Sequence, residues 1–288
     1  MKYKLITACI TAAVLAGCGS DDSSDSVNIQ AYDGAIMGIA GNFSCDNNVS
    51  GSIGTTNYQG MGTANASIFS YALETCTFNF IPTVGAVDVS NGKEMDAVSL
   101  SIPKGLFTSG TPIATPFTTL VAKALPEGAS YDSSTASDVL SKVLGSSFLN
   151  NTGLSVSQLM TNLDQSLSSL SDTNKSQLLA TTHVLTDVMA NASASSLTTD
   201  QIATATQNIA AKVVNDNPSY GDGTKFVTVP STVDLDAVKD AVIDDVTTIP
   251  DVGVVEKDSQ PVEDPDNATG STGGTGGTGS VGGGTGGA

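Results

Sequence analysis

The sequence predicts an α+β protein in which a small antiparallel β-sandwich precedes an α-helical bundle and a disordered tail follows. Before residue 115, apolar residues alternate with a period near two, which is the spacing of half-buried strands. After that residue they recur every three or four positions, as in amphipathic helices. From Pro250 the chain loses this periodicity and becomes acidic, then rich in Gly and Thr. These changes divide the chain into segments 1–17, 18–26, 27–114, 115–249 and 250–288.

Residues 1–17 predict a secretory signal peptide. Lys2 and Lys4 give a positive start, and Leu5 to Leu15 form an almost unbroken apolar run. That run is about eleven residues long, well short of the roughly 20 that a membrane-spanning helix needs. A charged start, a short apolar middle and small residues after it are typical of a signal that is removed on export.

The residues Leu15-Ala16-Gly17-Cys18 resemble the lipobox of bacterial lipoproteins, which has a branched apolar residue, two small residues and a cysteine. The resemblance implies cleavage before Cys18, a lipid on its sulfur and acylation of the new amino terminus. Two acyl chains anchor a protein stably, whereas one binds a membrane only marginally. The alternative is an ordinary signal peptide cut after Ala16 or Gly17, which leaves Cys18 as a free thiol.

Segment 18–26 is predicted to be a flexible tether. Gly, Ser and Asp follow Cys18, and they offer too little apolar surface to offset the entropy of ordering. Position 19 is Gly rather than Asp, and by resemblance to lipoprotein sorting in Gram-negative bacteria we expect the outer membrane. Either face of that membrane, including the cell surface, agrees with the sequence.

Segment 27–114 is predicted to form short antiparallel strands arranged as a sandwich. Pairs of Gly, Asn and Asp separate the runs, as turns between strands require. The runs with the alternating character of strands are 35–44, 66–73, 75–81 and 97–102.

The cysteines of the exported chain predict one disulfide. Cys9 leaves with the signal peptide and Cys18 takes the lipid, so Cys45 and Cys76 remain. In an oxidising compartment two remaining cysteines most simply pair; two buried free thiols are the alternative. A structural zinc needs four Cys or His ligands and the chain has one His, so neither a metal nor another cofactor is expected.

Segment 115–249 is predicted to form the helical bundle. A first short helix covers 118–125 and ends at Pro126. Further apolar stripes, each covering one face of a helix, lie in the ranges 136–148, 156–170, 178–192, 202–213 and 238–249. Between the last two stripes, residues 225–229 are predicted to be a strand or an extended crossing.

Two motifs resemble a loose group of bacterial surface lipoproteins and adhesin-like proteins. They are D-G-A-I-M-G-I-A at 33–40 and T-P-F-T-T-L-V-A at 115–122, in which Phe117 stands where Leu is usual. In that group a small β-sandwich, which begins near the first motif, leads through the second motif into a helical bundle. Members often carry a stretch suspected of binding calcium, of which only Asp46-Asn47-Asn48 remains here. The resemblance implies an architecture rather than an activity.

The net charge of the chain limits the classes of partner that it can bind. It carries 11 basic and 29 acidic residues, a net charge of −18, and Lys2 and Lys4 leave with the signal peptide. This charge repels phosphate backbones, so nucleic acid is excluded as a partner. A protein or a matrix component is expected instead. Asp244-Asp245 and the acidic tail could collect calcium loosely, but a solvated acidic face is the simpler interpretation.

The sequence contains no recognisable catalytic set. His183 is the only imidazole, and Asp187 follows one helical turn later. A hydrolase would hold both beside a serine in a specific geometry, yet no G-x-S-x-G turn surrounds any serine. The pattern therefore favours an exposed histidine on a helix face. The glycines of the tail precede no helix and form no phosphate-binding loop, so the chain is not expected to be an enzyme.

These observations favour a membrane-anchored lipoprotein that acts as a non-catalytic binding or adhesion module at the cell surface or in the envelope. Its expected contacts are the membrane, through the lipid on Cys18, and a protein or matrix partner. The alternative is a periplasm-facing accessory or assembly factor of a secretion, pilus or envelope complex. A weak hydrolase that uses His183 with a nearby serine is the third hypothesis.

Overall fold

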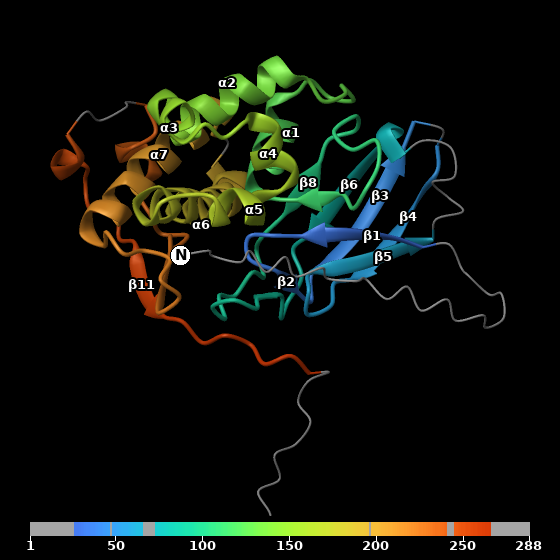
Figure 1. Cartoon of the computed structure of the whole chain (residues 1–288), viewed down its shortest axis with the longest axis horizontal. Coiled ribbons are helices and arrows are strands. Elements are labelled where there is room, and N and C mark those ends of the chain that lie inside the picture. The colour runs from blue at the N-terminus through green and yellow to red at the C-terminus, as the bar shows by residue number, and fades with distance from the viewer. Residues whose placement is uncertain (1–25, 47, 66–72, 196, 241–244, 266–288) are drawn as a thin grey trace, which may run out of the picture.

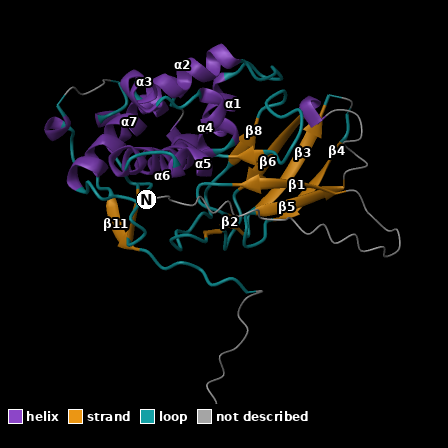
Figure 2. Cartoon of the chain, viewed as in Figure 1, coloured by secondary structure: helices purple, strands orange, loops and turns teal. Residues whose placement is uncertain are grey.

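The protein has a mixed α+β fold in which strands dominate the first part of the chain and helices the second. The computed structural model describes residues 26–46, 48–65, 73–195, 197–240 and 245–265. Most strands gather at one side of the molecule and the helices at the other (Figure 1). Figure 2 shows the same separation by type of element. The predicted α+β class is confirmed.

The larger sheet contains four antiparallel strands in the order β4-β3-β6-β8. Their bounds are β3 (Ala40–Cys45), β4 (Ser50–Thr55), β6 (Cys76–Ile81) and β8 (Leu100–Ile102). Buried residues alternate with more exposed ones along β6, where Cys76, Phe78 and Phe80 point into the core. The runs predicted at 75–81 and 97–102 therefore contain strands.

A disulfide joins Cys45 at the end of β3 to Cys76 at the start of β6. The two cysteines lie directly opposite each other in the antiparallel register, so the bond ties the two strands together at one end of the sheet. Both residues are buried in the core of this part. The predicted pairing is confirmed, and the alternative of two free thiols is wrong.

A second sheet has the strand order β5-β1-β9. Its strands are β1 (Ser26–Ala31), β5 (Met61–Asn65) and β9 (Ile113–Ala114), and a separate short pair joins β2 (Ile36–Met37) to β7 (Val87–Asp88). The strand β9 runs parallel to β1, whereas the sequence predicted antiparallel strands alone. Buried apolar side chains from both sheets share one core.

Two predicted segments, the tether and the strand at 66–73, lie largely outside the described residues. The tether was predicted to end at Ser26, but β1 already begins there; the rest of the tether, with Cys18, lies outside the described residues. The strand predicted at 66–73 also lies outside them, apart from Leu73, which begins the short 3-10 helix η2 (Leu73–Thr75).

Seven α-helices follow in the described chain. They are α1 (Pro116–Ala124), α2 (Ser133–Leu144), α3 (Ser146–Thr152), α4 (Val156–Thr161), α5 (Leu163–Ser168), α6 (Asp172–Ser195) and α7 (Thr199–Asp216). The stripes at 136–148 and 156–170 are each divided between two helices, because Gly145 and Asn162 end one helix and cap the next. Among the described helices, none combines the length and apolar character needed to cross a membrane.

Helix α1 begins at the second motif. Thr115 Oγ1 accepts a hydrogen bond from the backbone N–H of Thr118 at 3.1 Å, and Thr118 Oγ1 accepts one from the N–H of Thr115 at 2.8 Å. This is a capping box, and Pro116 follows at the first helical position, where its fixed φ is favourable. The two hydroxyls of Thr118 and Thr119 also bond the backbone of Ser101 in β8. The motif therefore both starts α1 and joins it to the larger sheet.

Helix α6 runs through the interior of the molecule. Every residue from Thr181 to Met189 is buried, although several of them are polar. A helix that is buried on all sides is normally apolar on all sides. The polar side chains of α6 therefore require partners from the elements packed against it, and the strand-rich part of the chain supplies several of them.

The helix predicted at 238–249 is wrong for the described residues. The described residues of that region hold only the short 3-10 helix η4 (Val246–Thr248); another, η3 (Leu235–Ala237), ends just before it, and residues 241–244 lie outside the description. Val, Ile, Thr and Asp are weak helix formers, and they dominate this stretch. Val238 and Ile249 are nevertheless buried in the helical core. These apolar residues therefore cover the core from irregular chain rather than from a helix.

The chain after Pro250 folds back onto the body of the protein. Strand β11 (Val255–Asp258) pairs antiparallel with β10 (Lys225–Thr228), which confirms a strand in the range 225–229. The next residues, 259–262, form what we call the strap. In the strap the N–H groups of Gln260 and Val262 donate to the backbone oxygens of Asn91 at 2.7 Å and Val89 at 3.0 Å. A disordered tail that starts at residue 250 is thus wrong for residues 250–265.

A glycine permits the close approach of the strap. A Cβ on Gly92 would lie 2.3 Å from the backbone oxygen of Gln260, and the φ of Gly92 is +77°. The strap is held from the other side by Tyr58, whose hydroxyl donates to the backbone oxygen of Val262 at 3.0 Å. Because β11 lies on the helical part and the strap contacts the strand-rich part, this segment links the two.

We expect Tyr58→Phe to lower the free energy of unfolding by about 1 kcal/mol, the usual net contribution of one hydrogen bond. The loss arises because the backbone oxygen of Val262 keeps its half-buried position without a donor. Urea denaturation at neutral pH measures it. Tyr131→Phe is the matched control, since the Tyr131 hydroxyl makes no hydrogen bond to any residue that the structure describes. Equal effects of the two substitutions would contradict a role for the strap contact.

Candidate functional site

A group of polar side chains is buried between α6 and the strand-rich part of the chain. Each is less than a tenth exposed, and they come from the turn after β1, from β7 and the turn that follows it, from α6 and from the loop before β10. We call this group the buried polar cluster. Its members are Asp33, Asp88, Lys93, His183, Thr186, Asp187 and Tyr220.

An ion pair lies at the centre of the cluster. Lys93 Nζ is 2.8 Å from Asp187 Oδ1, and the side chains are 3% and 10% exposed. Lys93 Nζ also donates to the backbone oxygen of His183 at 3.3 Å. The second oxygen of Asp187 accepts the backbone N–H of Val229 at 2.7 Å. Three segments, the turn after β7, helix α6 and the chain after β10, therefore converge on one buried pair.

Asp33 is the least satisfied member of the cluster. Its Oδ2 accepts a hydrogen bond from Thr186 Oγ1 at 2.6 Å, whereas its Oδ1 has no partner in the described structure. Burial raises the pKa of Asp33 to about 8, although Lys93 and the hydroxyl of Thr186 act in the opposite direction. Near neutral pH this carboxyl group therefore holds a proton.

Asp88 is buried beside Asp33. Its carboxylate accepts hydrogen bonds from the backbone N–H and the hydroxyl of Ser90, and from the amide of Asn91. Burial raises the pKa of Asp88, and these hydrogen bonds oppose the shift. Gly34 is required here, because a Cβ at that position would lie 2.3 Å from Asp88 Oδ1 and its φ is +77°. The Asp-Gly pair of the first motif thus supplies one carboxyl and makes room for another.

His183 is buried, so the prediction of an exposed histidine is wrong. Its Nδ1 lies 2.6 Å from the hydroxyl of Tyr220, and that hydroxyl accepts the N–H of Val227. The tyrosine proton therefore points to Nδ1, and the ring makes a second hydrogen bond to the backbone of Asp33. Burial and then the charge of Lys93 lower the pKa of His183 to about 3. The imidazole is neutral, and both of its nitrogens are engaged.

The buried charges do not balance. Three carboxyl groups lie in the cluster, while Lys93 is the one buried side chain of the described residues that carries a positive charge, because His183 is neutral. Lys93 is already paired with Asp187, so Asp33 and Asp88 depend on protons or on neutral hydrogen-bond donors. A buried carboxylate without a counter-charge is costly and is usually neutralised by a proton. Lys93 therefore balances one of the three carboxyl groups, and each of the other two adds an unbalanced negative charge when it ionises.

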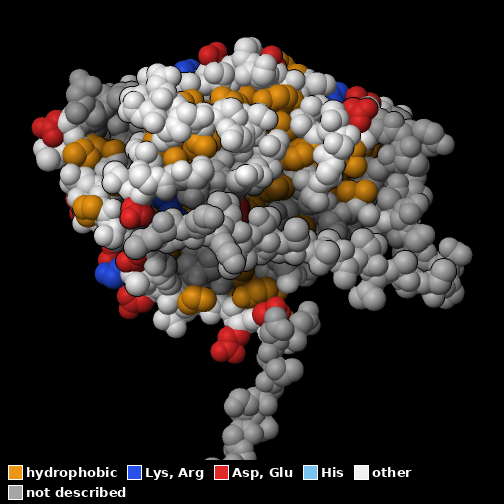
Figure 3. All heavy atoms as spheres, in the orientation of Figure 1, with side chains coloured by type: hydrophobic (Ala, Val, Ile, Leu, Met, Phe, Trp, Pro, Cys, Tyr) orange, Lys and Arg blue, Asp and Glu red, His pale blue; other side chains and the backbone are white. Residues whose placement is uncertain are grey.

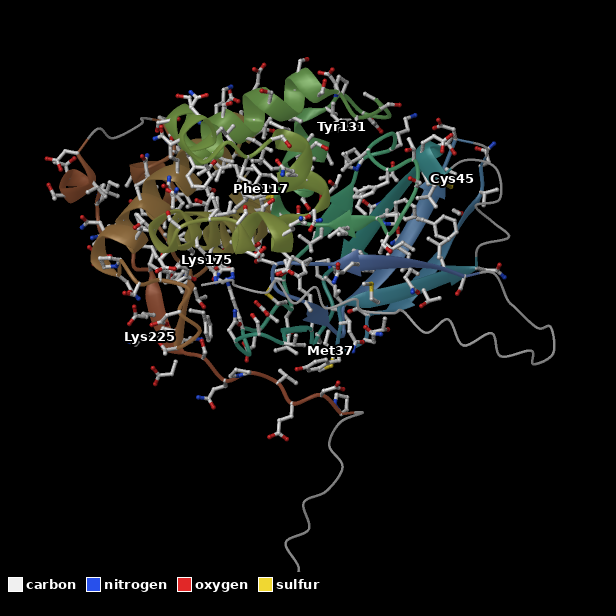
Figure 4. The ribbon with its side chains drawn as sticks, viewed as in Figure 1. Met37, Cys45, Phe117, Tyr131, Lys175 and Lys225 are labelled. Carbon is white, nitrogen blue, oxygen red and sulfur yellow. A yellow bond between two sulfur atoms is a disulfide. The ribbon has the colours of Figure 1, made fainter. Side chains whose placement is uncertain are left out.

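The residues predicted from the sequence are not assembled into one site. Cys18 lies outside the described residues, and Cys45, in its disulfide, is at the opposite side of the molecule from Lys175 on α6 (Figure 4). Asp46 pairs with Lys104 at 2.8 Å. In the described part of the chain, no group of His, Cys, Asp and Glu side chains is arranged to hold a metal ion.

Four members of the cluster were missed by the sequence interpretation, namely Asp88, Lys93, Thr186 and Tyr220. They come from three separate parts of the sequence and follow no recognisable motif. The local signals were the turns at Asp33-Gly34 and Asn91-Gly92, which were recognised as turns. Nothing near either turn indicates that both face the same helix, because only the packing of α6 brings them together.

The arrangement joins the strand-rich part and the helical part through buried polar contacts. In the described residues of the cluster, the imidazole and the ion pair are occupied by internal hydrogen bonds. No protein-family model matches the chain, and neither the curated proteins nor the solved structures contain a match to it.

Proposed function

We propose that this chain is an exported lipoprotein, anchored in the outer membrane through Cys18, whose folded body is a non-catalytic binding or adhesion module. The lipobox-like residues 15–18 and the polar tether after them support the anchor. In this proposal the two larger sheets act as a β-sandwich and the helices as a bundle. The tether lets this body face a protein or matrix partner.

The engagement of His183 is the observation that favours a non-catalytic role. A general base must reach the proton that it removes, directly or through one water. The imidazole of His183 is buried and bonded on both sides, and its pKa is lowered to about 3. Asp187, its neighbour on α6, is paired with Lys93. The groups on which a hydrolase would depend therefore hold the fold together.

The visible surface agrees with a binding role for uncharged or basic partners. Figure 3 shows a face on which uncharged polar side chains and backbone predominate, with hydrophobic patches among them, scattered Asp and Glu and few Lys. The overall charge of −18 favours partners with basic groups over anionic ones. We therefore expect a charge-assisted contact in which basic groups of the partner meet carboxylates of this chain.

Attachment assays test this proposal. A deletion strain is expected to attach less well to matrix-coated surfaces, and complementation with wild-type protein is expected to restore attachment. Complementation with Cys18→Ala should fail because the chain is neither acylated nor cleaved and so does not reach the outer membrane. Cys9→Ala is the matched control, since that cysteine lies in the signal peptide and should complement fully. Unchanged attachment of the deletion strain would contradict the proposal.

Protease treatment of intact cells separates the two possible faces of the membrane. A surface module should be cleaved by added proteinase K while periplasmic proteins stay intact. Protection of the protein until the outer membrane is opened would instead favour a periplasm-facing assembly factor.

A further inference from the structure

A cavity of about 230 Å³ lies beside the buried polar cluster. Its walls come from the turns after β1 and β7, from α5 and α6, from the loop before β10 and from the first residue of the strap. Asp33 lines one side, and Leu163, Leu167 and Leu179 form an apolar side. A cavity that combines an apolar side with polar groups is typical of small-molecule sites.

Two polar atoms in the lining residues lack partners. In the described structure, three buried side-chain polar atoms make no hydrogen bond, and two of them, Asp33 Oδ1 and Ser259 Oγ, belong to residues that line this cavity. Buried polar groups in folded proteins are nearly always satisfied, so each exception needs an explanation. A ligand that donates hydrogen bonds to both oxygens would explain why neither has a partner within the protein.

The charge balance indicates that this ligand is a cation. Asp33 has no counter-charge of its own, because Lys93 is paired with Asp187. A metal ion does not fit, since the described residues offer no set of three His, Cys, Asp or Glu side chains for one. An ammonium group fits better, because it brings one positive charge and several N–H donors.

We propose that this cavity binds a small aliphatic primary ammonium compound, with its nitrogen at Asp33 Oδ1 and Ser259 Oγ and its hydrocarbon against the three leucines. Lys175 is exposed on α6 at the rim and forms no ion pair in the described structure. It comes from the same side of the molecule as Lys225 of β10 (Figure 4). A carboxylate at the far end of the ligand would meet this positive rim, whereas a second ammonium group would be repelled.

Binding of an ammonium ion requires an ionised carboxylate. Since burial raises the pKa of Asp33 to about 8 in the free protein, the affinity should rise as the pH increases from 6 to 8. The neutral state of His183 does not change in this range, because its pKa is lowered. The other charged or titratable groups that face the cavity or Asp33 are Tyr32, Asp88, Lys93, Lys175, Asp187, Tyr220 and Lys225.

Calorimetric titration of the full-length chain with n-butylammonium chloride tests the site. We expect saturable 1:1 binding at pH 8, and a loss of about tenfold or more in Asp33→Asn, as for the removal of a charged hydrogen-bond acceptor. Asp33→Asn preserves the shape of the side chain, and Asp132→Asn is the matched control because Asp132 caps α2 at the surface. Equal binding to Asp33→Asn and the wild-type protein would overturn the proposal.

Ligand variants make the test independent of Asp33. Tetramethylammonium has the charge but no N–H donors, and 1-butanol has the chain but no charge, so neither should compete with n-butylammonium. Lys175→Glu should reverse the preference between 4-aminobutyrate and 1,4-diaminobutane, from the carboxylate to the second amine. Absence of binding by all the amines, or the same preference in Lys175→Glu, would show that the cavity holds water only.

Discussion

Replacement of Lys93 by methionine is expected to lower the free energy of unfolding by about 3–5 kcal/mol, because it breaks a buried ion pair from one side. Methionine keeps the length and apolar stem of the lysine but removes the only positive charge of the described cluster. Asp187 then keeps one hydrogen bond, from Val229, and loses its counter-charge. Natural domains are stable by about 5–15 kcal/mol, so the variant should be close to unfolding at 37 °C.

Guanidinium denaturation followed by circular dichroism measures this loss. The matched control is Lys142→Met, which removes an ion pair with Asp200 whose side chains are 51% and 70% exposed. Exposed pairs contribute about 0–1 kcal/mol. The double variant Lys93→Met/Asp187→Asn should recover part of the stability, since it also removes the unpaired charge. A loss in Lys93→Met no larger than in Lys142→Met would show that the pair does not hold the two parts together.

Asp33→Asn is expected to make the protein more stable at neutral pH, which is unusual for a buried substitution. The pKa of Asp33 is raised from 3.8 to about 8 in the folded protein. Such a group stabilises the fold fully below pH 4, and this contribution is lost as the pH rises through 8. The cost is about 1.4 kcal/mol for each pH unit above 4, so asparagine should restore up to about 4 kcal/mol at pH 7.

The pH dependence distinguishes this effect from simple repacking. The difference in unfolding free energy between Asp33→Asn and the wild-type protein should be near zero at pH 4 and should grow steadily to pH 8. Asp132→Asn should give no such trend, because its carboxylate lies at the surface and its hydrogen bonds lower its pKa. A stabilisation that does not change with pH would contradict a buried, protonated Asp33.

The helical elements were the part of the fold that the sequence predicted best. The stripes that became α6 and α7 are long and periodic, and the second motif contains the capping box of α1. The predicted helix boundaries were wrong where a single residue ends a helix, as at Gly145 and Asn162. The apolar stripe continues through both positions, so the sequence showed no interruption there. The stripe at 238–249 failed because apolar residues can seal a core from irregular chain.

Several strands left little trace in the sequence. The strand β4 reads S-G-S-I-G-T and β5 reads M-G-T-A-N, with one or two apolar residues each. Small residues are needed in these strands, since a Cβ on Gly51 would lie 2.8 Å from the ring of Phe43. The alternation that signals a strand is therefore absent where a large side chain from a neighbouring strand fills the space.

The buried polar cluster could not be predicted from the sequence. The i,i+4 spacing of His183 and Asp187 was recognised, but a polar pair on a helix usually faces water. Whether α6 is covered on that side depends on the turns that carry Asp33 and Lys93, which are about 90 residues or more away in the chain. The polar side of α6 becomes buried only because other parts of the chain pack against it.

The intact mass of the protein extracted from membranes tests the central claim, an acylated amino terminus at Cys18, most directly. We expect a chain that starts at this residue, carries a diacylglyceryl group and an amide-linked fatty acid, and keeps the disulfide between Cys45 and Cys76. Cys18→Ala should show neither processing nor acyl mass. A wild-type protein found in the soluble fraction with the mass of unmodified polypeptide would contradict the anchored module proposed for this chain.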